Sequence, residues 1–126
     1  MIMMNGDLIT NVNINNFLTY HYESKSDLTI GAVKYEFEVP YGVIQPEEQN
    51  FKSIVEKPKQ KFFVNAGIYI IDPKLIVSIA KGPIDMPTWI NKISTDENKV
   101  NIFPIFEYWV DIGNKNQLEK VKQEML

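Results

Sequence analysis

Two residue types, cysteine and arginine, are missing from this chain of 126 residues, and each absence limits the kinds of site it can form. Cysteine is absent, so the chain can form neither a disulfide framework nor a zinc–thiolate centre. This absence fits a reducing compartment, and we expect a cytoplasmic protein. No apolar run approaches the roughly 18 residues that a membrane-spanning helix needs. The first residues also lack the charged-then-apolar order of a signal peptide.

Arginine is absent as well, since all 13 positions counted as lysine or arginine are lysine. Arginine is the usual bidentate clamp on phosphate groups. Any phosphate bound by this chain must therefore be held by lysine, backbone N–H groups or a metal ion. Biased codon usage is an alternative explanation for the missing arginine. The formal net charge of -3 argues against a nucleic-acid-binding protein, because such proteins usually carry a basic surface.

The residues that are present predict one globular domain with an α/β fold. The length of 126 residues and the hydrophobic fraction of 44% are sufficient to bury a core. Strand patterns alternate with helix patterns and occur at residues 1–7, 28–35, 62–71, 99–103 and 108–111. Residues 62–71 are apolar on both faces, which predicts a central strand. Two short extended runs, residues 41–44 and 52–55, are joined by a polar linker and predict a β-hairpin arm.

Four helices are predicted from capping residues and from apolar side chains that repeat on one face. Asn13 caps the first helix, and Asp72 followed by Pro73 begins a short second helix that ends at Gly82. The apolar faces of the first, third and fourth helices contain Ile14, Phe17, Leu18 and His21, then Met86, Trp89, Ile90 and Ile93, then Leu118, Val121 and Met125. His21 is therefore interpreted as a packed core residue without a catalytic role.

Two distant aspartates, Asp7 and Asp111, each close an apolar run beside a glycine. Buried parallel strands deliver functional groups in this way, at the edge where open α/β sheets bind ligands. Two carboxylates brought together there would repel each other unless a cation lay between them. The sequence therefore predicts a divalent metal site of the kind that binds phosphate-bearing substrates. The alternatives are a turn residue after Asn5 and Gly6 for Asp7, and a helix cap for Asp111.

Five short motifs give the chain a resemblance to a known family. In chain order they are Asn5-Gly6-Asp7, Tyr41-Gly42-Val43, Glu56-Lys57-Pro58, Asn65-Ala66-Gly67-Ile68-Tyr69 and Trp109-Val110-Asp111-Ile112-Gly113. Together they resemble the sugar-1-phosphate nucleotidylyltransferases, over the C-terminal half to two-thirds of the catalytic domain. The resemblance is greatest to mannose-1-phosphate guanylyltransferase-like members of surface-polysaccharide synthesis. It implies a partial Rossmann-like nucleotide-diphospho-sugar transferase fold, with a mixed, mostly parallel sheet, flanking helices and the hairpin arm.

The resemblance also implies roles for individual residues. Asp7 and Asp111 match the family positions that hold Mg²⁺ between the nucleotide and the sugar phosphate. Lys57 matches a lysine that contacts the sugar phosphate, and Glu56 a glutamate that contacts sugar hydroxyls. The positions expected to line the sugar are Gly42, Asn65, Ala66 and Gly67. The alternatives are a solvated strand end for Lys57 and a closely packed strand glycine for Gly67.

One family feature has no counterpart in the chain, namely the glycine-rich loop with arginine that grips the nucleoside triphosphate. The family reaction transfers a nucleoside monophosphate to a sugar-1-phosphate and releases pyrophosphate. We therefore expect residues 1–126 to be a C-terminal portion of the domain that is inactive in isolation. A non-catalytic module is the alternative, which binds sugar phosphates or forms homo-oligomers through an exposed sheet edge. A related glycosyltransferase would need an Asp-x-Asp motif, which the sequence lacks.

Overall fold

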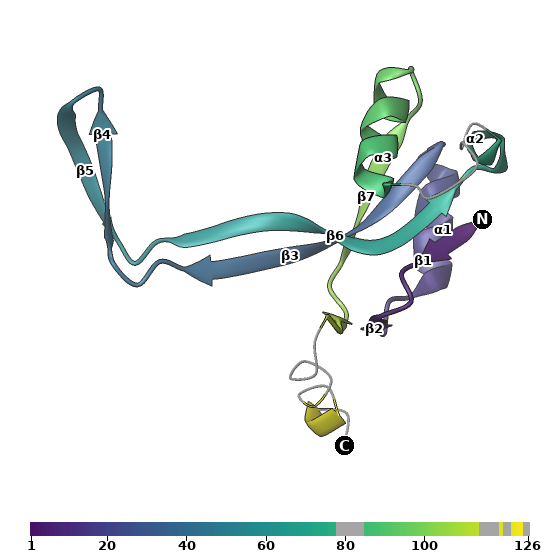
Figure 1. Ribbon diagram of the computed structural model, residues 1–126, viewed down its shortest axis with the longest axis horizontal. Helices are drawn as coiled ribbons and strands as arrows, with labels where there is room; N and C mark the ends of the chain where they lie inside the picture. The colour runs from purple at the N-terminus through teal and green to yellow at the C-terminus, as the bar shows by residue number, and fades with distance from the viewer. Residues whose placement is uncertain (78–84, 114–118, 120–121, 125–126) are drawn as a thin grey trace. The chain divides into compact units, whose positions relative to one another are not determined.

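The computed structural model describes residues 1–77, 85–113, 119 and 122–124 (Figure 1). It divides into two compact units, which are described separately. The core unit comprises Met1–Val33 and Asn65–Leu126, and the arm unit comprises Lys34–Val64. In chain order the elements are β1 (Ile2–Met4), β2 (Leu8–Thr10), α1 (Ile14–Glu23), β3 (Leu28–Glu38), β4 (Gly42–Glu47), β5 (Asn50–Glu56), β6 (Lys59–Ile71), α2 (Pro73–Ile76), α3 (Met86–Thr95), β7 (Val100–Ile105) and β8 (Trp109–Asp111).

The main sheet is mixed and has the strand order β1-β6-β3-β7. Strands β3 and β7 are parallel, with Leu28 opposite Val100 and Val33 opposite Ile105. Strands β1 and β6 are antiparallel. The sequence prediction of an α/β fold with a mixed sheet is therefore confirmed, and β6 lies inside the sheet as expected.

Helices cover both faces of this sheet. Side chains on a strand alternate between its faces, and β6 has apolar side chains on both of them. On one face Ala66, Ile68 and Ile70 of β6 pack in a cluster with Phe17 of α1. On the other face Tyr69 and Ile71 pack with Leu28, Leu75 of α2 and three residues of α3, namely Trp89, Ile90 and Ile93. The C-terminal half of β6 is therefore buried on both sides.

The predicted helix starts are confirmed at α1, α2 and α3. The Asn13 side chain accepts a hydrogen bond from Asn16 N at 3.0 Å, and Asp72 accepts one from Lys74 N at 3.0 Å. Asp85 caps α3, which has a proline in its first turn as expected. The predicted end at Gly82 and the apolar face with Leu118, Val121 and Met125 lie outside the described residues.

The structure corrects three strand predictions. Residues 1–7 were expected to form a buried parallel strand, but β1 ends at Met4, runs antiparallel to β6 and is largely exposed at the sheet edge. In β6 only the residues from Ala66 onward are buried, whereas Phe62 and Phe63 are 50% and 59% exposed. Strand β7 continues through Pro104, which an edge strand tolerates because one of its sides forms no ladder hydrogen bonds.

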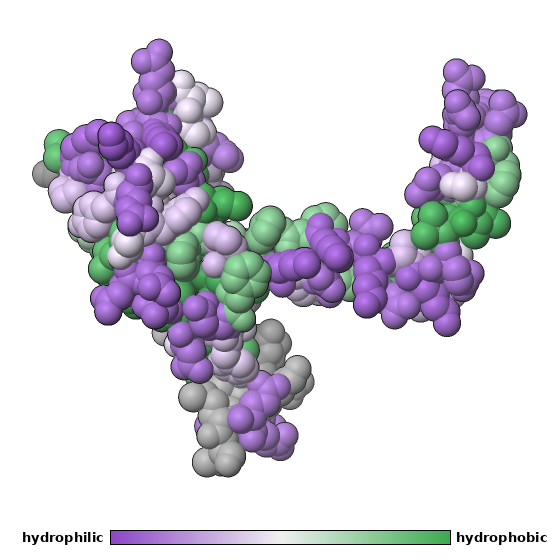
Figure 2. Space-filling view, turned by 180° about the vertical axis from the view of Figure 1, so that it is seen from behind, coloured by the Kyte–Doolittle hydropathy of each residue, from purple (hydrophilic) through white to green (hydrophobic). Residues whose placement is uncertain are grey.

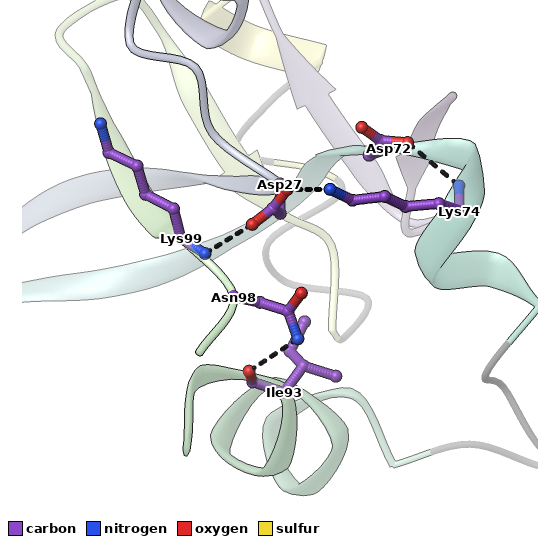
Figure 3. A network of polar contacts seen from close by, with 6 residues as sticks. All are labelled: Asp27, Asp72, Lys74, Ile93, Asn98 and Lys99. Atoms are coloured by element: carbon purple, nitrogen blue, oxygen red, sulfur yellow. Dashed lines mark hydrogen bonds and ion pairs between the residues drawn. The ribbon is translucent and has the colours of Figure 1, made fainter. Parts of the chain in front are cut away.

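Asp27 joins the start of β3 to two other elements, as Figure 3 shows. Its carboxylate pairs with Lys74 Nζ of α2 at 2.7 Å and accepts a hydrogen bond from Lys99 N at 2.7 Å. These contacts lower the pKa of Asp27, with the Lys74 bond as the largest cause and the Lys99 bond next. Acid should therefore weaken this junction only as the pH falls below the ordinary range of aspartate.

The arm unit contains the predicted hairpin of β4 and β5, which pair antiparallel. Both strands are longer than expected, and the turn between them is correspondingly shorter. No residue from Lys34 to Val64 is buried. Exposed apolar side chains of the hairpin include Ile44, Phe51 and Ile54, and Figure 2 shows green surface on this element. Among the helices in the described ranges, none has the length and apolarity to span a membrane.

Candidate functional site

Asp7 and Asp111 meet in the core unit, although they are far apart in the sequence. Strands β2 and β8 pair antiparallel, so that Leu8 lies opposite Asp111. Ile112 N donates a hydrogen bond to Asp7 O at 2.8 Å. The Asp7 carboxyl also lies close enough to Asp111 to raise the pKa of its carboxyl group. They therefore converge through a separate two-stranded sheet that includes β2, which the sequence analysis did not foresee, and not through two parallel strands.

The environment of Asp111 disfavours the negatively charged form of its carboxyl group. Partial loss of hydration, and then the nearby Asp7 carboxyl, raise the pKa of the Asp111 carboxyl above its ordinary value. Both aspartates are nevertheless exposed, so a ligand can reach them. A cation between them would relieve the repulsion.

The donor set fits magnesium in chemical type. Within the described ranges no group of three or more His, Cys, Asp or Glu side chains could hold a metal ion. Magnesium typically uses only one or two protein carboxylates and completes its shell with phosphate oxygens and water. Asp7 and Asp111 provide such a pair of carboxylates and would be the residues that hold the ion.

A tight turn places Asp7, as the turn interpretation proposed. Asn5 N donates to Gly67 O at 2.9 Å just before this turn, which contains Gly6 and Asp7. Leu8 follows and packs against the core cluster around Phe17. A turn role and a role beside Asp111 are thus compatible. The helix-cap interpretation of Asp111 concerns residues outside the described part of the chain.

Asn65, Ala66 and Gly67 form an ordered segment of β6 beside this turn. The Asn65 side chain accepts a hydrogen bond from Gly67 N at 2.8 Å and donates one to the Tyr69 hydroxyl at 2.7 Å. Ala66 and Gly67 are buried, and Ala66 O accepts a hydrogen bond from Trp109 Nε1 at 2.8 Å. All three residues expected to line a sugar therefore have partners within the protein.

Gly67 is a closely packed glycine with a left-handed backbone, at φ 75°. A Cβ atom at this position would overlap the Asn5 side-chain amide and come within 3.3 Å of Leu8 Cδ1. The geometry thus matches the close-packing alternative for this residue. Asn5 and Trp109 were noticed only as motif members, and their hydrogen-bonding roles depend on tertiary contacts that have no local sequence signal.

The other expected site residues lie together in the arm unit. Gly42 is opposite Glu56 in the β4–β5 pair, and a Cβ atom on Gly42 would lie 3.3 Å from Glu56 Oε2. Lys57 follows β5, and its N–H donates to Tyr41 O at 3.2 Å. Its φ of 45° is unusual for a residue with a side chain, and such strained backbone clusters at functional sites. The side chains of Glu56 and Lys57 are exposed.

Comparison with known proteins agrees with these motifs. The family model described as "Nucleotidyl transferase" matches residues 1–126. A Sulfolobus acidocaldarius protein, provisionally named as a mannose-1-phosphate guanyltransferase, is 28% identical over 128 residues, covering 100% of this chain and 35% of the relative. The mannose-1-phosphate guanylyltransferase catalytic subunit beta of Drosophila melanogaster is 28% identical over 115 residues, covering 88% of this chain and 31% of the relative. The chain thus spans about a third of the length of these curated relatives.

The fold has solved counterparts. The crystal structure of HddC from Yersinia pseudotuberculosis matches with a TM-score of 0.68 and 23% identity, over 100% of this chain and 55% of that one. At this identity the likeness supports the fold, and the family assignment depends on the family model, which matches the whole chain. The chain belongs to the nucleotidyl transferase family.

Proposed function

We propose that this chain provides metal-binding and sugar-phosphate-binding residues of a sugar-1-phosphate nucleotidylyltransferase. The reaction transfers a nucleoside monophosphate from a nucleoside triphosphate to a sugar-1-phosphate, giving a nucleotide sugar and pyrophosphate. The observation that carries the proposal is the meeting of Asp7 and Asp111 across β2 and β8. The names of the curated relatives support mannose-1-phosphate and a guanine nucleotide as substrates. The HddC protein has also been crystallised with GMP-PN.

In this proposal Asp7 and Asp111 hold Mg²⁺ with their carboxylate oxygens. The ion, when bound, would neutralise phosphate charge that builds up as the nucleoside monophosphate is transferred. The protein contributes by holding two like charges together in advance, so that a cation is bound where they meet. Such preorganisation avoids the cost of moving charged groups during the reaction.

In the arm unit, Lys57 is proposed to bind the phosphate of the sugar-1-phosphate. An exposed ammonium group can pair with phosphate, and its strained backbone fixes the direction from which the side chain leaves the strand end. Glu56 and the main chain of Gly42 are proposed to bind sugar hydroxyls. These two residues are neighbours in the hairpin, where the absent side chain of Gly42 leaves room beside the Glu56 carboxylate.

Calorimetric titration of the purified chain tests the proposal. We expect Mg²⁺ to bind and mannose-1-phosphate to bind more tightly when Mg²⁺ is present. The Asp111→Asn variant should lose Mg²⁺ affinity by at least about tenfold, because it removes one of two charged ligands. Asp96→Asn is the matched control, since it makes the same change at an exposed position at the end of α3. Equal losses in both variants, or none in either, would count against the aspartate pair as the metal site.

The isolated chain is proposed to bind these ligands without turnover, because none of its residues matches the glycine-rich arginine loop of the family. A pyrophosphate-release assay with GTP and mannose-1-phosphate measures this directly. Sustained release by the 126-residue chain would show that another part of it holds the nucleotide.

A self-association module is the second candidate function. It is favoured by the exposed apolar side chains of the arm unit, which include Ile44, Phe51 and Ile54. Sedimentation velocity over a range of protein concentrations discriminates between the two functions. Oligomers without Mg²⁺-dependent sugar-phosphate binding favour the module, and monomers that bind both ligands favour the transferase.

A further inference from the structure

Two consecutive carbonyl groups of β6 each accept a hydrogen bond from a segment that is distant in the sequence. Ala66 O accepts a hydrogen bond from Trp109 Nε1 at 2.8 Å, and Gly67 O accepts one from Asn5 N at 2.9 Å. Trp109 stands two positions before Asp111, and Asn5 stands two positions before Asp7. Each aspartate therefore lies two positions after a hydrogen-bond donor, and the two donors bind consecutive carbonyl groups of the buried strand β6.

The Asn65 side chain fixes the conformation of this part of β6. Its Oδ1 accepts the Gly67 N–H at 2.8 Å, and its Nδ2 donates to the Tyr69 hydroxyl at 2.7 Å. Tyr69 is only 2% exposed, so the second bond connects Asn65 to the core. Gly67 needs such support because its left-handed backbone is one of several accessible to glycine.

Apolar packing also holds the same two segments. Leu8 and Trp109 both pack against the buried cluster that contains Phe17, Ala66 and Ile68. Leu8 follows Asp7 directly. Hydrogen bonds and packing therefore act together on the segments that carry the two aspartates.

We propose that Asn65 and Trp109 are positioning residues for the Asp7–Asp111 pair. Trp109 binds the β8 segment to Ala66 O, and Asn65 shapes the backbone at Gly67 that receives the Asn5 N–H. The two carboxylates meet because their segments are held at adjacent carbonyls of β6. In this role Asn65 acts through Gly67. The importance of this geometry for metal binding depends on the proposed function above.

The first test is made without metal and follows hydrogen exchange at the Ile112 amide, whose N–H is bonded to Asp7 O. Trp109→Phe keeps an aromatic ring but removes the indole donor, and it should raise Ile112 exchange about tenfold relative to amides of α1. Trp89→Phe is the matched control, because Trp89 packs in the cluster on the other face of the sheet. It should change the exchange of Ile112 and of α1 to the same extent.

The Asn65 variants keep the test decisive if Trp109→Phe does not fold. Asn65→Leu removes both side-chain hydrogen bonds at similar size and should raise Ile112 exchange about tenfold. Asn65→Asp keeps an acceptor for Gly67 N and can accept a hydrogen bond from the Tyr69 hydroxyl instead of donating one, so Ile112 exchange should stay close to that of the unaltered chain. A purely space-filling role would give the opposite order, with Leu tolerated at least as well as Asp.

The second test measures Mg²⁺ affinity by calorimetry. Trp109→Phe should weaken binding about tenfold, whereas Trp89→Phe should leave it unchanged. If the unaltered chain bound no Mg²⁺ but the exchange results were as expected, the proposed function would fail and the positioning role would stand. If neither Trp109→Phe nor Asn65→Leu altered relative Ile112 exchange, the positioning role would be refuted, whatever the metal affinity.

Discussion

Gly67 accepts a hydrogen bond from Asn5 N, and Gly6 follows Asn5 in the chain. The two glycines differ in what an added side chain would meet. A Cβ atom on Gly67 would overlap the Asn5 amide and require a strained backbone, whereas one on Gly6 would meet nothing within 4 Å. Gly67→Ala should therefore lower the free energy of unfolding by about 1–3 kcal/mol. Gly6→Ala should change it by less than about 0.5 kcal/mol. Urea denaturation of the two variants measures both values, and equal effects would contradict the packing described for Gly67.

His21 shows how a residue that could do chemistry is used for stability. It is 5% exposed, and its Nδ1 lies 2.7 Å from Thr29 Oγ1. Burial lowers the pKa of this imidazole, against the raising influence of Asp72 and Asp27. The sequence-based interpretation of His21 as a buried residue of α1 is confirmed.

The lowered pKa of His21 gives a testable dependence of stability on pH. The unfolded chain takes up a proton near the ordinary histidine value of about 6.5, whereas the folded chain does so only at lower pH. Stability should therefore fall as the pH is lowered through this range, by at most about 1.4 kcal/mol per pH unit for one proton. His21→Gln should remove most of this slope in denaturation experiments between pH 7.5 and 5.5. An unchanged slope would assign it to other groups.

At the scale of elements, the helices could be predicted and the directions of the strands could not. The caps at Asn13 and Asp72 and the apolar spacing of α3 are local signals, because each involves residues within about one turn of each other. Strand pairing is decided by distant parts of the chain. The antiparallel direction of β1 depends on β6, and β2 exists as a strand only because β8 pairs with it.

The end of α1 shows a local feature that can be improved. Ser26 N donates to His21 O at 3.2 Å and Lys25 N to Tyr22 O at 3.1 Å, which is the Schellman arrangement of a helix end. Lys25 occupies the left-handed position of this motif, at φ 53°, where glycine is preferred.

Lys25→Gly should accordingly raise the free energy of unfolding by about 1 kcal/mol, because the left-handed backbone costs glycine nothing. Lys92→Gly makes the same change at an exposed position inside α3 and should lower it by about 1 kcal/mol. Thermal denaturation of the two variants should therefore give shifts of opposite sign. Two negative shifts would mean that the lysine side chain contributes more than the backbone strain costs.

At the scale of the whole molecule, the sequence predicted the candidate site residues, whereas the contacts that hold them in place depend on the fold. The meeting of Asp7 and Asp111 was expected from their similar surroundings in the sequence, and the structure brings them together by a different pairing of strands. The hydrogen bond from Trp109 to Ala66 O joins residues 43 positions apart and has no local pattern. The division of β3 and β6 between two units could not be seen from residue types, since both strands are apolar or aromatic along most of their length.

The two units should differ in local stability, and hydrogen exchange measures this for the whole chain. Ile68 to Ile71 of β6 are buried on both faces of the sheet, whereas every residue of β4 and β5 is at least partly exposed. An isolated two-stranded hairpin is only marginally stable in water. Amides of β4 and β5 should therefore exchange at least about a hundredfold faster than those of Ile68 to Ile71. Comparable protection that increased with protein concentration would instead mean that a second copy covers the apolar side chains of the arm unit.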